Sequence, residues 1–126
     1  MNEYKGSLIS FLSSQLFLIA SLFNYYRWNN YIEGITILLL YFTSILYHSS
    51  GNIYLRNVDM AITKLTVLVC GIMSLLKKNI LPIIFVILVT FFYYANTSAT
   101  PFYHSMFIHF PGFVGFMMLY FNSINN

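Results

Sequence analysis

The sequence predicts an all-α bundle of about five transmembrane helices that forms a single domain over residues 1–126. Composition is the first observation: 59% of the residues are hydrophobic and only 7% are charged, whereas soluble domains carry roughly 25% charged residues. The second observation is that the apolar residues fall in runs close to the length of about 20 residues that a helix needs to cross a bilayer. These two observations exclude a water-soluble globule and a disordered chain.

Five apolar segments are the candidate spans. The first, at about 7–23, lacks the positively charged start of a signal peptide because Glu3 offsets Lys5, so we expect a permanent span. Small hydroxyl residues on one helix face let helices approach closely in lipid, and in this segment that face carries Ser7, Ser10, Ser14 and Ser21.

The second and third spans are expected at about 35–49 and 59–76, and the fourth at about 80–94. The fifth, at about 101–121, begins where Thr100 and Pro101 match an N-cap and a first helical position. Because the intervening loops are short, consecutive helices should be antiparallel neighbours. Glu3 and Glu33 are interpreted as loop residues outside the spans.

The charged residues argue against nucleic-acid binding, and the single cysteine argues against cysteine-based sites. The net charge of +3 is scattered, and no basic cluster exceeds the pair Lys77 and Lys78, so nucleic-acid binding is not expected. The single cysteine, Cys70, excludes an internal disulfide and a cysteine-based metal cluster.

The ionisable residues near the span ends are expected to share one membrane face. His48 closes the second span, Asp59 opens the third, and His104 and His109 lie near the start of the fifth. Alternating span direction puts all of these positions on the same side. Ionisable residues at membrane depth usually mark a functional site.

Three imidazoles with one open position are the ligand set of a catalytic zinc site. Zinc lowers the pKa of its bound water to about 7, and a nearby carboxylate can accept that water's proton. We therefore expect His48, His104 and His109 to bind Zn²⁺ and Asp59 to hold the water. Ser44 shares a helix face with His48 at a spacing of i, i+4 and could donate a hydrogen bond to an oxyanion.

This pattern resembles the signature of the CREST group of membrane proteins. That group includes the alkaline ceramidases, the haemolysin III proteins, the progestin and adiponectin receptors and related GPI-processing lipases. The resemblance is carried by the stretch 43–49, TSILYHS, the stretch 55–59, LRNVD, and the histidine pair in the last span. It implies a zinc ion bound by His48, His104 and His109, with Asp59 held to the metal through water and Ser44 beside it.

The chain departs from the family pattern in two ways. The family usually has seven spans rather than five, and its last histidine pair has the spacing His-x-x-x-His. Here His104 and His109 are five residues apart, which in a regular helix would point them about 140° apart. Pro111 has no N–H to donate to the Phe107 carbonyl. We therefore expect a bulge, such as a π-turn, or a kink between His104 and Pro111 that brings both imidazoles toward His48 and Asp59.

The expected function is a membrane zinc hydrolase that acts on a lipid amide or ester reached from within the bilayer. Two alternatives remain open on sequence alone. One is a non-catalytic membrane protein of the same fold, similar to a receptor or a haemolysin III protein. The other is a b-type haem protein with two facing histidines as axial ligands.

Overall fold

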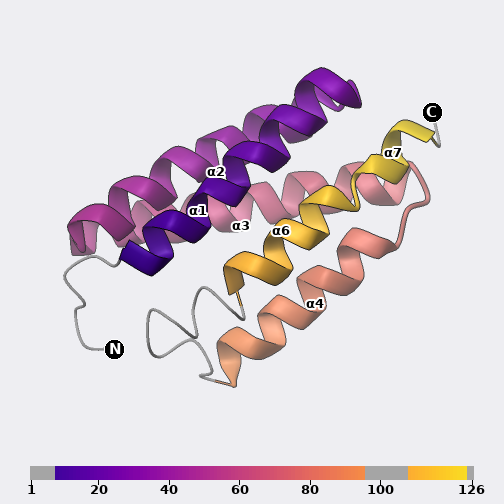
Figure 1. The fold of residues 1–126 in the computed structure, drawn as a ribbon. Coiled ribbons are helices and arrows are strands. Elements are labelled where there is room, and N and C mark those ends of the chain that lie inside the picture. Colours follow the sequence, from indigo (N-terminus) through magenta and orange to yellow (C-terminus); the bar gives the residue numbers. More distant parts are fainter. Residues whose placement is uncertain (1–7, 96–107, 125–126) are drawn as a thin grey trace.

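The computed structural model describes residues 8–95 and 108–124 of the chain, and this part is built from helices joined by short connections (Figure 1). Helix α1 covers Leu8–Leu22 and continues into a π-helical turn, η1, at Phe23–Arg27. Helix α2 covers Tyr31–Ser50 and α3 covers Ile53–Leu76. The predicted all-α bundle is confirmed.

Three helical stretches are long and apolar enough to cross a membrane. Leu8–Arg27 and Tyr31–Ser50 have 20 residues each, and Ile53–Leu76 has 24. At about 1.5 Å of rise per residue, these lengths match or exceed the hydrocarbon thickness of about 30 Å. The later helices are shorter: α4 is Leu81–Tyr94, α6 is Phe110–Met117 and α7 is Tyr120–Ile124.

The helices pack in an order that the short loops only partly dictate. As expected for neighbours, α1 packs extensively on α2, and α2 on α3. Helix α6 packs mainly against α4, and smaller contacts join α6 to α1 and α3 to α4 (Figure 1). The last part of the described chain therefore closes the bundle against the first, and residues near position 109 meet residues of α1.

Helix α3 begins earlier than the sequence analysis expected, at Ile53 rather than at residue 59. The Asn52 side chain accepts hydrogen bonds from the backbone N–H groups of Tyr54 and Leu55, at 2.8 and 3.3 Å, and so caps the helix. Gly51 ends α2 in the left-handed conformation with φ 68°. The connection thus shrinks to two residues, and Asp59 lies inside α3 rather than at its start.

The interpretation of Glu33 as a loop residue is wrong. Helix α2 starts at Tyr31, so Glu33 lies in its first turn, and the side chain is only 2% exposed. A carboxylate is favoured at a helix N-terminus by the helix dipole. The Asn122 side chain, from α7, also donates a hydrogen bond of 3.1 Å to Glu33 Oε2.

Four buried asparagines tie the same end of the bundle together. The Asn79 side chain donates to Asn122 Oδ1 at 2.8 Å and to the Met118 carbonyl at 3.1 Å. The Asn24 side chain donates to the Phe116 carbonyl of α6 at 3.2 Å, and the Asn30 side chain donates to the Leu119 carbonyl, between α6 and α7, at 2.9 Å. We call Asn24, Asn30, Asn79 and Asn122, together with Glu33, the asparagine cluster.

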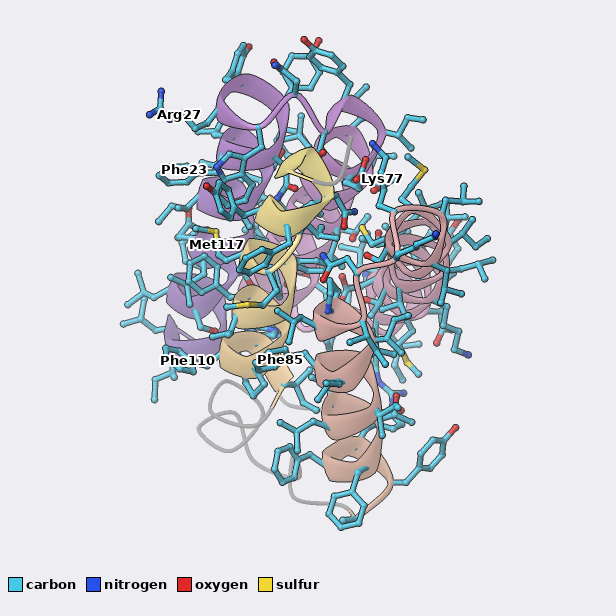
Figure 2. The ribbon with its side chains drawn as sticks, turned by 90° about the vertical axis from the view of Figure 1, so that its right-hand side faces the viewer. Phe23, Arg27, Lys77, Phe85, Phe110 and Met117 are labelled. Carbon is cyan, nitrogen blue, oxygen red and sulfur yellow. The ribbon has the colours of Figure 1, made fainter. Side chains whose placement is uncertain are left out.

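The described part of the chain is polar inside and apolar outside. Its buried side chains include more polar or charged residues than hydrophobic ones, while many large hydrophobic side chains are exposed. Figure 2 shows such side chains projecting from the bundle, with Arg27 and Lys77 toward the end that holds the asparagine cluster. The small hydrophobic core includes Phe17, Ile37 and Leu119. This distribution fits helices that face lipid and bury their polar groups against one another.

A pair of glycine substitutions tests the contact between η1 and α2. A Cβ atom at Gly34 would lie 2.8 Å from Tyr25 Cβ and 3.0 Å from the Tyr25 backbone nitrogen. Because backbone cannot move aside easily, Gly34→Ala should destabilise the fold by about 1–3 kcal/mol. Thermal unfolding in detergent micelles measures the change.

Gly71→Ala is the matched control, because a Cβ at Gly71 would meet nothing within 4 Å. It should leave the melting temperature unchanged or raise it, since alanine favours a helix interior over glycine by up to about 1 kcal/mol. Equal effects of the two substitutions would contradict the described packing of α2 on η1.

Candidate functional site

Helix α2 supplies two of the predicted site residues from its last turns. His48 is fully buried, with 0% of its surface exposed, and Ser44 is 1% exposed. Their i, i+4 spacing puts both on the helix face that packs inside the bundle. The Tyr47 ring lies beside His48, with 4.8 Å between ring centroids. Both predicted polar side chains therefore point inward.

His109 reaches the same place from the other end of the chain. Its imidazole is buried and lies edge-on to that of His48, with 4.8 Å between centroids and 73° between ring planes. Ile108 and His109 are π-helical and directly precede α6, whose second residue is Pro111. Of the segment in which a bulge or kink was predicted, only residues 108–111 are described. His104 lies outside the described residues.

Helix α1 contacts the site through residues that the sequence analysis did not single out as site residues. Ser13 Oγ lies 2.5 Å from His109 Nδ1. One turn later, the Phe17 ring packs edge-on against the His109 ring, with centroids 5.2 Å apart. The serine-rich face of the first span was the available signal, but Ser13 lies beside the predicted stripe rather than on it. Only the tertiary packing of α6 on α1 reveals its role.

Ser44 is also held by α1, through the hydroxyl of Ser14 at an oxygen–oxygen distance of 2.7 Å. Ser14 itself donates to the backbone carbonyl of Ser10 at 2.7 Å. A serine has one hydroxyl proton, so when Ser14 bonds that carbonyl it accepts from Ser44. To act as an oxyanion donor, the Ser44 hydroxyl must therefore turn away from Ser14.

Asp59 lies on α3 and faces the same stretch of α2. The Thr43 hydroxyl donates to Asp59 Oδ1 at 3.0 Å. The hydroxyl of Thr63, one turn along α3, instead bonds the Asp59 backbone carbonyl at 2.7 Å. Thr43 precedes Ser44, so the carboxylate lies next to the part of α2 that carries the buried serine. The structure thus brings the His48 and His109 rings into contact, with Ser44 one turn before His48 on α2, and Asp59 contacts α2 through Thr43.

The described histidine pair could supply two ligands to one metal ion only if a nitrogen of each ring points toward that ion. Zinc–nitrogen distances of about 2.0–2.1 Å in a tetrahedral site put the centroids of two bound imidazoles roughly 5 Å apart, and the His48 and His109 centroids are 4.8 Å apart. Within residues 8–95 and 108–124, no group of three His, Cys, Asp or Glu side chains could hold a metal. The expected third ligand, His104, is outside these residues, so the described part of the site supplies two.

Comparison of the chain with protein-family models, with curated proteins and with solved structures finds no match. The resemblance to the CREST group therefore stays a hypothesis from the sequence motif.

Proposed function

We propose that this chain is an integral, multi-pass membrane hydrolase of the CREST type, which uses zinc to cleave an amide or ester bond of a lipid. The observation that carries the proposal is the buried contact between His48 and His109, with Ser44 on the same helix face as His48. Placing an imidazole inside a membrane helix bundle costs free energy, so such residues are rare. Where they occur, they commonly bind ions or transfer protons.

The membrane part of the proposal is supported by the distribution of side chains. Three helices are long and apolar enough to span a bilayer, and two shorter apolar helices accompany them. Many large hydrophobic side chains are exposed on the outside, while serine, threonine and asparagine make up much of the buried set in the described part. A lipid substrate would reach such a protein laterally, from within the bilayer.

The residues at the site suit hydrolysis of a carbonyl compound. Zinc bound by His48, His109 and His104 would polarise the substrate carbonyl and lower the pKa of water. Asp59, oriented through Thr43 at Oδ1, would take the proton of the attacking water on its other carboxylate oxygen. The water oxygen bonds to the carbonyl carbon, the C–N or C–O bond breaks, and the leaving group takes the proton from Asp59. The products are a fatty acid and an amine or an alcohol.

The geometry argues against His48 and His109 as an axial pair for haem. Axial ligands bind iron from opposite faces of the macrocycle, which must then fit between the two rings. These imidazoles are in edge contact, with centroids 4.8 Å apart, and leave no room for it. A non-catalytic membrane protein with the same fold is the alternative that the following measurements separate from a hydrolase.

We predict that His48→Ala and His109→Ala each lower the zinc content and the melting temperature together. Zinc that binds only the folded protein stabilises it by mass action, by about 2.7 kcal/mol at a free concentration of 100 times Kd. Elemental analysis and thermal unfolding of detergent-purified protein measure both quantities. Asn79→Ala is the control: it breaks the asparagine cluster at the other end, so it should lower the melting temperature but retain zinc. Full zinc content in both histidine variants would refute the proposed ligands.

We further predict that Asp59→Asn keeps most of the zinc but reduces lipid hydrolysis by at least about 100-fold, because an amide cannot accept the water's proton. The Asn oxygen can still accept the Thr43 hydrogen bond, so the fold should be retained. The assay follows fatty-acid release from a ceramide and from a glycerolipid ester. Activity in Asp59→Asn equal to wild type would disprove this mechanism. A zinc-loaded wild type that cleaves neither class would favour the non-catalytic alternative.

A further inference from the structure

Helix α1 holds the His109 ring at two points. Ser13 Oγ lies 2.5 Å from Nδ1, and the edge-on contact with Phe17, at 5.2 Å between centroids, restricts rotation of the imidazole. Ser13 and Phe17 are four residues apart and so lie on the same face of α1. His109 is therefore oriented by a helix that carries none of the predicted metal ligands.

The hydrogen bonds around Ser13 indicate where the His109 proton lies. Ser13 Oγ also lies 3.0 Å from the backbone carbonyl of Ser10, in the i−3 arrangement common for serine in helices. A carbonyl can only accept a hydrogen bond, and Ser13 has one proton to give. Both contacts are hydrogen bonds only if Ser13 donates to the carbonyl and His109 Nδ1–H donates to Ser13.

We propose that Ser13 is a positioning residue that holds His109 in the Nδ1–H tautomer and leaves Nε2 unprotonated. A neutral histidine carries one ring proton, so a hydrogen bond that requires an N–H at Nδ1 leaves Nε2 unprotonated. The tautomer is independent of any reaction. Its consequence, that Nε2 is the nitrogen that binds zinc, rests on the proposed function.

The consequence for metal binding follows from general behaviour of zinc sites. A metal-bound histidine almost always donates its second ring N–H to a fixed acceptor, and loss of that acceptor typically weakens metal binding about 10–100-fold. The usual acceptor is a carboxylate, a carbonyl or water. Here a helix serine, itself held by the Ser10 carbonyl, would take that role.

Nitrogen-15 NMR of histidine-labelled, metal-free protein in micelles tests the tautomer directly, at alkaline pH where the imidazoles are neutral. The His109 signals are assigned by their loss in His109→Ala. In wild type we expect a protonated Nδ1 and an unprotonated Nε2. Ser13→Ala should lose this preference, while Ser13→Thr, which keeps the hydroxyl, should retain it. A proton on Nε2 in wild type, or an unchanged ring spectrum in Ser13→Ala, would overturn the proposal.

Zinc affinity then separates this proposal from the proposed function. We expect Ser13→Ala to weaken zinc binding about 10–100-fold and Ser13→Thr to restore it. Ser21→Ala is the matched control, because this buried serine of the same helix bonds the Gly34 carbonyl at the other end of the bundle; it should leave zinc affinity unchanged. If the tautomer responds as expected but wild type binds no zinc, Ser13 still positions His109 and the hydrolase proposal fails. Equal loss of affinity in Ser13→Ala and Ser21→Ala would reduce Ser13 to a packing role and overturn its assignment.

Discussion

The fold depends on hydrogen bonds that polar side chains make inside a bundle whose outside is apolar. A polar group that faces lipid has no water to bond with, so it is buried against a neighbouring helix and paired there. Ser21 bonds the Gly34 carbonyl at 2.7 Å, and Thr66 bonds the Thr36 carbonyl at 3.2 Å. These bonds between helices fix which face of each helix turns inward.

The two ends of the bundle use this constraint differently. At one end the asparagine cluster joins η1, α2, the α3–α4 connection and α7. Its side-chain amides donate hydrogen bonds to backbone carbonyls and to one another. At the other end stand side chains that can bind metal or move protons: His48, His109, Ser44 and Asp59. The asparagine cluster thus holds the helix ends together. The helices fixed in this way carry the ionisable and hydroxyl side chains at the opposite end. Serines of α1 serve both ends, through Ser21 and through Ser13.

The helices could be predicted from the sequence because apolar length alone identifies them, but their ends could not. Glu33 was assigned to a loop because a charged residue usually marks the end of an apolar segment. Its buried carboxylate instead accepts a hydrogen bond from Asn122, which lies 89 positions away in the chain. The start of α3 was missed because Arg56, Asn57 and Asp59 interrupt its apolar sequence, so only the Asn52 cap marks where the helix begins. Likewise, the order of the spans predicted that His48 and His109 lie on the same side of the bundle, whereas the contact between Ser13 and His109 exists only once the segment before α6 packs on α1.

X-ray absorption at the zinc edge tests the central claim most directly, because it counts the ligands of the bound ion. The account predicts three imidazole nitrogens at about 2.0–2.1 Å with oxygen completing the shell, from His48, His109 and His104. One imidazole should be lost in His109→Ala, and none in Asn79→Ala. A wild-type protein that holds no zinc, or zinc bound by fewer than three imidazoles, would contradict it.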